Sequence, residues 1–203
     1  MPKAGVLYIV ATPIGNVGDI SARACATLSS VSIVLAEDTR HSGGLFKRLG
    51  IKADLHSYHQ HNEEARADWA IERLKMGEDL ALISDAGTPL LSDPGYRLVQ
   101  AAHDNGVRVE PIPGASSIIA ALSAAGLPSD RFFFEGFLPS KAGSRRTRLS
   151  ELRGFPHTLI FLESPHRILA CVKDMLAIFG EDRLAVIARE LTKVHETVYK
   201  RDL

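Results

Sequence analysis

Short apolar runs alternate with helix-like segments along nearly the whole chain. Residues 6–11, 31–36 and 80–83 are almost entirely apolar, so both faces of each run would be buried if the chain there is extended. Weaker runs of the same kind cover 54–58 and 107–112. Buried strands separated by helices are typical of βαβ units. The pattern therefore predicts an α/β fold whose first half is a mostly parallel sheet.

Helix signals fill the spaces between these runs. Asn62 has the residue type of an N-cap, and Glu63 and Glu64 would place negative charge in the first turn of the following helix. Gly77 would end that helix, since glycine readily adopts the left-handed conformation of a C-terminal stop. A second helix is expected over 96–105. These signals support strand–helix–strand repetition.

A dense turn signal, Pro111-Ile112-Pro113-Gly114, interrupts the pattern. We expect a domain boundary there, with one α/β domain over 1–113 and a second over 114–203. The second half is predicted to contain further strands and helices. The expected strands are 132–137, 158–162, 184–188 and 197–199, and the expected helices are 116–125, 145–152 and 167–179.

Composition excludes several classes of protein. The chain has 203 residues with 24 basic and 24 acidic side chains, so its formal net charge is zero. A globally basic nucleic-acid coat is excluded, and any RNA contact must depend on a local patch. Cys25 and Cys171 are far apart and form no metal-binding pair. We expect a cytoplasmic protein, because the apolar run near the N-terminus is too short for a signal or a membrane span.

Small and polar residues concentrate where four predicted strands end, at 12–19, 37–42, 84–95 and 113–117. Ligands of open α/β sheets bind outside the carboxyl ends of the strands, so these loops predict a ligand site. The alternative is the ordinary composition of strand–helix loops. The first loop has neither a dinucleotide fingerprint nor a P-loop, which disfavours NAD and ATP. S-adenosylmethionine, an adenosine ligand without phosphate, fits this loop better.

The loop after the second strand has side chains that could handle a proton. Glu37, Asp38, Arg40 and His41 lie within five positions, and such groups can position a substrate or accept its proton. A solvated turn with an N-cap is the alternative. The histidines of 56–61 lack a nearby cysteine or a suitably spaced third ligand, so we predict no metal site.

One basic run stands out. Residues 141–148 contain Lys141, Arg145, Arg146 and Arg148 and no acid. A basic loop of this kind is typical of a phosphate contact. The alternative is a solvated helix start, which cations disfavour because they oppose the helix dipole.

Seven motifs together resemble one family. They are TPIGN at 12–16, AEDTRHS at 36–42, SDAGTPLLSDPG at 84–95, PIPGASS at 111–117, FEGFLP at 134–139, ESPHR at 163–167 and ARELTK at 188–193. In this order, they resemble the ribosomal RNA small-subunit methyltransferase I group of the tetrapyrrole methylase superfamily. The resemblance covers essentially the whole chain.

The resemblance implies two α/β domains, the first with a mostly parallel sheet and the second with a mixed sheet, and S-adenosylmethionine in a cleft between them. It implies a homodimer that methylates the ribose 2′-oxygen of a cytidine in 16S rRNA, at the decoding region of the small subunit, with no DNA or membrane partner. The cofactor residues implied are Pro13, Ile14, Gly15, Ser84, Asp85, Ala86, Leu90, Ser116, Ser117, Leu162, Leu191 and Thr192.

For the chemistry, we predict a role for Asp38, His41, Glu37 and Arg40, with Asp38 or His41 preferred as the base. For the RNA, the predicted residues are Lys141, Arg145, Arg146, Arg148, His166 and Arg167. Two alternatives stay open, namely a methyltransferase acting on a tetrapyrrole and a non-catalytic ribosome-binding module. Because the chain ends directly after a strand-like run, we also expect the second domain to continue beyond residue 203.

Overall fold

The computed structural model describes residues 4–203. The chain divides into two compact units between Ser116 and Ser117. The boundary predicted after residue 113 lies close to this division.

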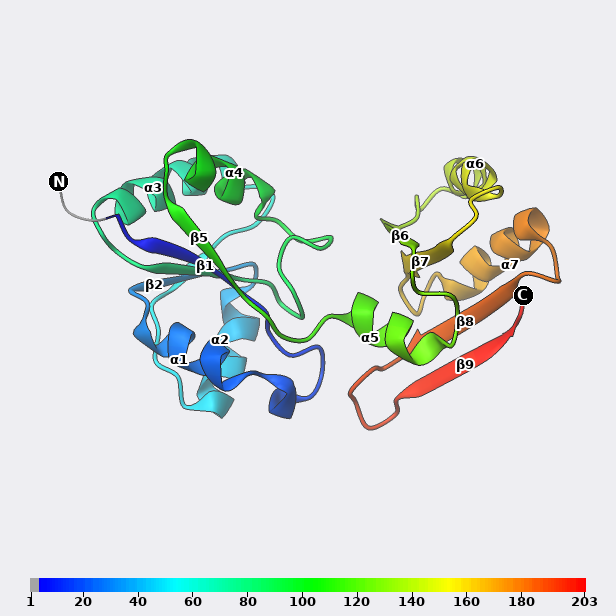
Figure 1. Ribbon diagram of the computed structural model, residues 1–203, viewed down its shortest axis with the longest axis horizontal. Helices are drawn as coiled ribbons and strands as arrows, with labels where there is room; N and C mark the ends of the chain where they lie inside the picture. The colour runs from blue at the N-terminus through cyan, green and yellow to red at the C-terminus, as the bar shows by residue number, and fades with distance from the viewer. Residues whose placement is uncertain (1–3) are drawn as a thin grey trace. The chain divides into compact units, whose positions relative to one another are not determined.

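Unit 1 is built on a five-stranded sheet in which every pair of neighbouring strands is parallel (Figure 1). The strand order is β3-β2-β4-β1-β5. Its strands are β1 (Val6–Val10), β2 (Ile33–Ala36), β3 (Leu55–Ser57), β4 (Leu80–Ile83) and β5 (Arg108–Ile112). Its helices are η1 (Val17–Asp19), α1 (Ala22–Ser30), α2 (Thr39–Leu49), α3 (Glu63–Lys75) and α4 (Tyr96–Asp104). The predicted parallel sheet is confirmed.

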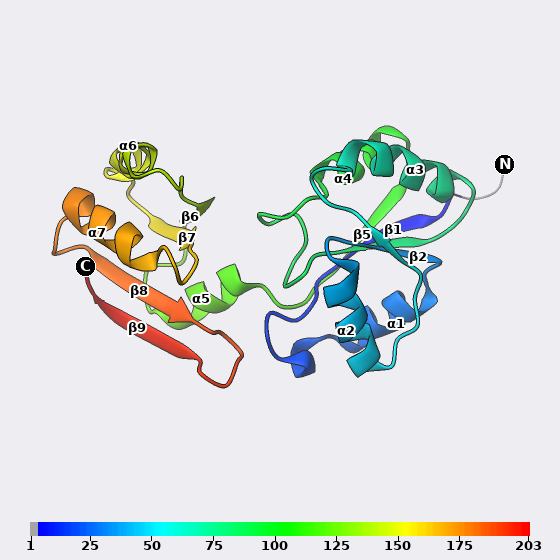
Figure 2. The same cartoon turned by 180° about the vertical axis from the view of Figure 1, so that it is seen from behind.

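Helices cover both faces of this sheet, which explains why the central strands β2 and β4 are apolar throughout. In β4, Leu80 and Leu82 pack with α3 and α4, whereas Ala81 and Ile83 pack with α1 and α2 on the other side. All four side chains are buried. Figures 1 and 2 show the two helix pairs on opposite faces. Alternate residues of one strand therefore enter separate cores, as expected for a doubly covered sheet.

The connections of β1 and β4 define where a ligand can reach the sheet. These strands are neighbours, but the chain leaves β1 towards α1 on one face and leaves β4 towards α4 on the other. Loops that diverge in this way open a crevice at the carboxyl end of the sheet, which is the usual ligand position in open α/β proteins. The loops 12–16 and 84–95 are its two sides.

Unit 2 has four strands in two pairs of different sense. Strands β6 (Phe132–Phe137) and β7 (Thr158–Leu162) are parallel, and β8 (Leu184–Arg189) and β9 (Thr197–Asp202) are antiparallel. Its helices are α5 (Ser117–Ala125), α6 (Ala142–Leu152) and α7 (Ile168–Phe179). The mixed character predicted for the second sheet is confirmed. The prediction that a helix begins at Arg145 was wrong, since α6 begins at Ala142 and includes most of the basic run.

In residues 4–203, no helix is both long and apolar enough to cross a bilayer.

Candidate functional site

Two backbone hydrogen bonds join the loops that follow β1 and β4. The Thr12 N–H donates to the Gly87 carbonyl at 2.9 Å, and the Gly87 N–H donates to the Thr12 carbonyl at 3.1 Å. The Thr12 hydroxyl also donates to the Ser84 carbonyl at 3.2 Å. Thr12 is 1% exposed, so these bonds are shielded from water. They fix the separation of the two loops across the crevice.

The loop after β5 joins the same assembly. The Thr88 hydroxyl donates to the Ala115 carbonyl at 3.1 Å. Gly114 lies so close to β1 that an added Cβ would stand 3.0 Å from the Ala11 Cβ. Three of the four loops predicted from the sequence are therefore in direct contact.

Several residues of the 84–95 loop have a strained backbone. Leu90 and Ser92 have φ values of 72° and 71°, a left-handed conformation that non-glycine residues rarely adopt. Gly87 has φ 85°, and a Cβ there would meet the Ile14 side chain at 3.2 Å. Such strain persists only where the surrounding structure holds it, and it gathers at ligand sites.

The fourth loop is attached through Asp85. Its carboxylate accepts a hydrogen bond from the Asp38 N–H at 3.1 Å. Asp38 in turn caps α2, since its Oδ1 accepts from the Arg40 N–H at 2.8 Å and from the His41 N–H at 3.2 Å. These two bonds, that from Arg40 first, lower the pKa of Asp38. A lowered pKa makes Asp38 a weaker base, and N-capping explains its residue type without a catalytic role.

Glu37 has the opposite electrostatic environment. Burial raises its pKa, and the negative charges of Asp85, Asp93 and Asp38 raise it further. Asp93 also has a raised pKa, chiefly because of burial, although a hydrogen bond with Ser84 opposes that shift. Raised carboxylate pKa values are typical of groups that exchange protons near neutral pH. Of the four side chains predicted for the chemistry, Glu37 fits a base best, whereas Arg40 and His41 are exposed on the first turn of α2.

The chemistry of these joined loops suits a ligand without phosphate. Pro13 is buried, and Ile14 and Leu90 are half-buried. The loops 12–16 and 84–95 contain small residues and the carboxylates Asp85 and Asp93, but no lysine or arginine. No group of three or more metal-ligating His, Cys, Asp or Glu side chains occurs in the described part of the chain.

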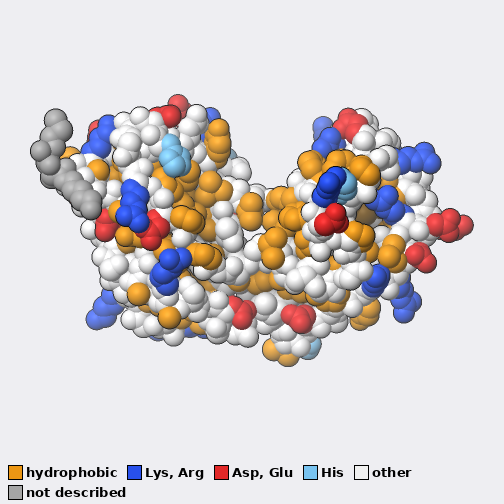
Figure 3. Space-filling view, in the orientation of Figure 1, with side chains coloured by type: hydrophobic (Ala, Val, Ile, Leu, Met, Phe, Trp, Pro, Cys, Tyr) orange, Lys and Arg blue, Asp and Glu red, His pale blue; other side chains and the backbone are white. Residues whose placement is uncertain are grey.

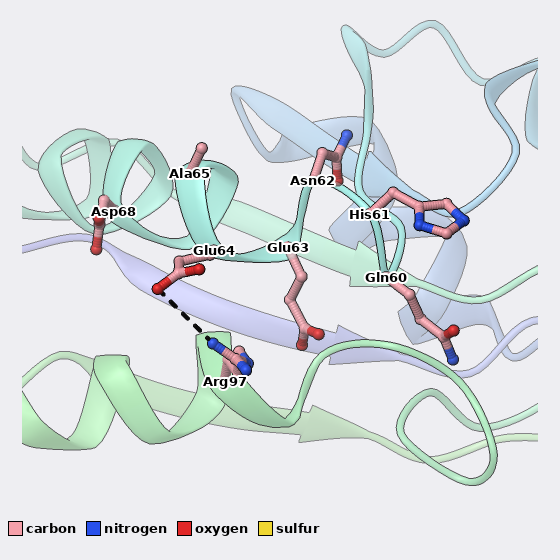
Figure 4. Close-up of a pocket in the computed structure, with 8 residues that line it drawn as sticks. All are labelled: Gln60, His61, Asn62, Glu63, Glu64, Ala65, Asp68 and Arg97. Atoms are coloured by element: carbon pink, nitrogen blue, oxygen red, sulfur yellow. Dashed lines mark ion pairs between the residues drawn. The ribbon is translucent and has the colours of Figure 1, made fainter.

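A separate hollow of about 640 Å³ opens at the start of α3. Figure 4 shows Glu63 and Glu64 extending from α3 on the side of α4, where Arg97 lies 3.9 Å from Glu64. The hollow is lined by Gln60, His61, Asn62, Glu63, Glu64, Ala65, Asp68 and Arg97. Glu63 also hydrogen-bonds to the end of the 84–95 loop, through the Gly95 N–H.

In unit 2, the predicted cofactor residues lie at the end of β7 and just after β8. Leu162 ends β7, and Leu191 and Thr192 are half-buried in the turn between β8 and β9. Glu190 and Thr192 have φ values of 52° and 67°, so this turn is strained in the same way as the 84–95 loop. Their cofactor role, like that of Ser116 and Ser117 at the division between the units, stays a prediction.

The basic run is largely neutralised by acids from other parts of unit 2. Arg145 is only 5% exposed, and its guanidinium lies 2.6 Å from the Asp174 carboxylate. Arg148 donates through Nε and Nη2 to the two oxygens of Glu135, both at 2.7 Å, and through Nη1 to Glu151. Two of the four cations of the run are therefore closely paired with acids, of which Asp174 and Glu135 lie outside α6 and Glu151 lies within it. Their predicted contact with RNA stays a prediction.

Arg167 is also engaged inside the unit. It lies 3.1 Å from Glu163 and donates to the Leu138 carbonyl at 2.7 Å. Lys141, Arg146 and His166 are exposed. On the face drawn in Figure 3, basic and acidic side chains of the described residues are interspersed. Of the residues predicted for RNA, these three are the ones whose side chains reach solvent most freely.

The sequence patterns did not single out Thr12, Gly87, Thr88 or Asp93, although the first three connect the loops. Each lies inside a motif that was recognised, but nothing in the local sequence indicates which loop it contacts. A threonine that follows a buried strand is the available signal, and it is weak.

Comparisons with known proteins identify the family of the chain. The family model described as Tetrapyrrole (Corrin/Porphyrin) Methylases matches residues 6–203. A relative from Pseudomonas aeruginosa, named ribosomal RNA small subunit methyltransferase I, is 58% identical over 97% of this chain and 70% of its own length. The relative of the same name from Escherichia coli O157:H7 is 52% identical over 96% of this chain and 68% of its own length.

The chain belongs to the tetrapyrrole methylase family. Among solved structures of this fold is the uroporphyrin-III C-methyltransferase of Thermus thermophilus complexed with S-adenyl homocysteine, with a TM-score of 0.66. It is 19% identical, and the match covers 98% of this chain and 88% of that one. This structural similarity supports the tetrapyrrole methylase fold. The relatives at 58% and 52% identity, both named ribosomal RNA small subunit methyltransferase I, indicate the branch of the family.

The ion pairs inside unit 2 predict that substitutions of two neighbouring arginines will change the free energy of unfolding by different amounts. Arg145→Ala should lower the free energy of unfolding by about 3–5 kcal/mol, because it leaves the Asp174 carboxylate buried without its partner. Arg146→Ala should change it by less than about 1 kcal/mol, since Arg146 is 58% exposed and 3.9 Å from Asp174. Urea unfolding measures both. Equal losses would contradict the structural role of Arg145.

Proposed function

We propose that the chain is an S-adenosylmethionine-dependent methyltransferase that methylates the ribose 2′-oxygen of a cytidine in 16S rRNA. The observation that supports this most directly is the 58% identity, over 97% of the chain, to a protein named ribosomal RNA small subunit methyltransferase I. The loops joined by Thr12 and Gly87 supply the ligand site that such an enzyme needs.

The crevice fits S-adenosylmethionine by its chemistry. The molecule carries a positive sulfonium and no phosphate, which suits a site with carboxylates and without a phosphate-binding loop. The small residues of loops 12–16 and 84–95 would let a ligand approach the backbone closely. We expect Pro13, Ile14 and Gly15 on one side of the crevice and Ser84, Asp85, Ala86 and Leu90 on the other to hold it.

When bound, S-adenosylmethionine would supply an activated methyl group for the ribose oxygen and leave as S-adenosylhomocysteine, while the hydroxyl would have to lose its proton. Residues of this chain have to align the hydroxyl, exclude water and accept that proton. We assign proton acceptance to Glu37, because its environment increases its basicity. Asp38 would support Glu37 indirectly by holding the start of α2.

Lys141, Arg146 and His166 are the side chains that we expect to contact RNA phosphates, since they are exposed. Arg145, Arg148 and Arg167 would act indirectly, by fixing the β6–α6 loop and α6.

We further propose that the substrate is the assembled small subunit, that the enzyme is a homodimer and that it works in the cytoplasm. A neutral chain gains little from nonspecific attraction to free RNA.

The other two readings have weaker support. A tetrapyrrole substrate would rest on solved structures of 18–23% identity, which show the fold alone. A non-catalytic ribosome-binding module would have no need for the strained loops at 84–95 and 190–192.

The proposed function is tested with S-adenosylmethionine carrying a labelled methyl group. Small subunits, free 16S rRNA and uroporphyrinogen III are offered in parallel. We expect label in the small subunit, at one ribose that becomes resistant to alkaline cleavage because its 2′-oxygen is blocked. Label in the tetrapyrrole alone would replace this proposal, and no label anywhere would favour the binding module.

Substitution of two adjacent acids separates the base from the cap. Glu37→Gln should lower kcat by about 10²–10⁴-fold with cofactor affinity nearly unchanged. Asp38→Asn keeps an N-capping oxygen and should lower kcat far less. Because Glu37 must lose its proton before it can accept another, wild-type activity should rise with pH through its raised pKa. A larger loss in Asp38→Asn would return the role of base to Asp38.

A methyl group at Gly87 tests the crevice itself. Gly87→Ala would place a Cβ against Ile14 and retain a strained φ of 85°, so we expect the Kd for S-adenosylhomocysteine to rise about tenfold. Gly106→Ala is the matched control, since Gly106 has φ 66° but open space around it. Calorimetric titration gives both values. Similar weakening in the two variants would mean that backbone strain alone, and not the crevice, is responsible.

A further inference from the structure

Helix α4 begins without a cap of its own. Its N-cap residue is Gly95, which has no side chain to accept the free N–H groups of the first turn. The N–H of Gly95 itself donates to Glu63 Oε1 at 3.1 Å, as the N-cap N–H does to a first-turn glutamate in a capping box, and Glu63 belongs to the first turn of α3. A carboxylate at a helix start is stabilised by the helix dipole. The acid that serves α4 therefore comes from another helix.

The Glu63 carboxylate is itself held in position by a buried side chain. The Tyr58 hydroxyl donates to the same oxygen at 3.3 Å, and Tyr58 is fully buried. The Tyr58 N–H donates to the Ala36 carbonyl at the end of β2. A chain of contacts thus runs from the central sheet through Tyr58 and Glu63 to Gly95.

Asn62 fixes the turn that leads to Glu63. Its side chain was expected to cap α3, and it makes no such bond. It points back instead, accepting from the His59 N–H at 2.8 Å and donating to the Ser57 carbonyl at 3.2 Å. The position of Glu63 is consequently set by the turn before α3 as well as by Tyr58.

Gly95 matters because it ends the strained 84–95 loop. Its φ is 136°, and an added Cβ would stand 2.7 Å from the Leu82 side chain. The other end of the loop is held by Thr12 and by the Ser84 hydroxyl, which donates to the Gly87 carbonyl at 3.3 Å. Leu90 and Ser92 keep their left-handed backbones only if both ends stay fixed.

We propose that Glu63 is a positioning residue for the cofactor loop, which caps α4 from α3 and thereby holds the 84–95 loop in its binding conformation. This inference rests on the proposed function, because it assigns Glu63 to the binding of S-adenosylmethionine. The hydrogen bonds of Glu63 join it to Tyr58 and Gly95, and neither is among the predicted cofactor residues. Its effect is transmitted through Gly95.

The test compares two adjacent glutamates. Glu63→Ala should raise the Kd for S-adenosylhomocysteine about tenfold, since the loop loses the contact that fixes its end. Glu64→Ala is the matched control, because the Glu64 side chain is 87% exposed and lies 3.9 Å from the exposed Arg97 guanidinium. It should bind as the wild type does. Titrations are made well below the melting temperature of every variant.

Two further variants separate positioning from general stability. Glu63→Gln keeps an acceptor oxygen for the Gly95 N–H and should restore affinity to within about threefold of wild type. Tyr58→Phe removes one donor and leaves the Gly95 contact, so its effect should be smaller than that of Glu63→Ala. Amide exchange at Gly95 should accelerate in Glu63→Ala and return to the wild-type rate in Glu63→Gln.

Each outcome has a definite meaning. If wild-type protein does not bind S-adenosylhomocysteine, the proposed function fails, and this inference fails with it. If wild type binds and Glu63→Ala binds equally well, positioning by Glu63 is overturned and the proposed function stands. A Glu63→Ala variant that melts earlier but binds normally overturns it too. If Glu63→Ala does not fold, Glu63→Gln and Tyr58→Phe decide, because weakened binding in Tyr58→Phe but not in Glu63→Gln supports the contact chain.

Discussion

The site depends on the paired backbone hydrogen bonds between Thr12 and Gly87. They join loops that leave neighbouring strands towards opposite faces of the sheet, and the hydrogen bond from the Thr12 hydroxyl to the Ser84 carbonyl reinforces them. Backbone pairing needs no particular side chain at either residue. It does need a glycine-type backbone at 87, where φ is 85°. A single conformational requirement thus sets the geometry of the crevice, and the contacts of Thr88, Asp85 and Glu63 extend it outwards.

Much of this architecture could be predicted from the sequence. Strands buried on both faces have continuous apolar runs, so 80–83 and 31–36 were recognisable without any contact information. The parallel sheet follows from their alternation with helices, and the ligand edge follows from where polar residues cluster. Where a strand coincides with an apolar run, its boundaries were predicted well. The helix predicted over 145–152 began too late, because the basic residues at the start of α6 form no apolar stripe.

Side-chain partners could not be predicted, since they depend on which segments the fold brings together. Arg145 and Arg148 have the local sequence of a phosphate contact, yet Asp174 and Glu135 neutralise them from other elements. Asn62 has the residue type of a cap, but its side chain serves the preceding turn. In each case local chemistry predicted an available group that another partner engages. For the arginines that partner is distant in sequence, whereas for Asn62 it is the turn three to five residues before it.

The neutralised basic run also bears on how this enzyme selects its substrate. Proteins that bind nucleic acid through many free cations gain affinity by releasing counterions, and that gain is the same for every RNA sequence. Arg145 and Arg148, held by Asp174 and Glu135, release few counterions. The exposed cations of the 141–148 run remain for phosphate contacts, so the salt dependence of RNA binding should be smaller than four free cations would give. The nonspecific part of the affinity is then reduced, and contacts that depend on the shape of the RNA contribute a larger share of it.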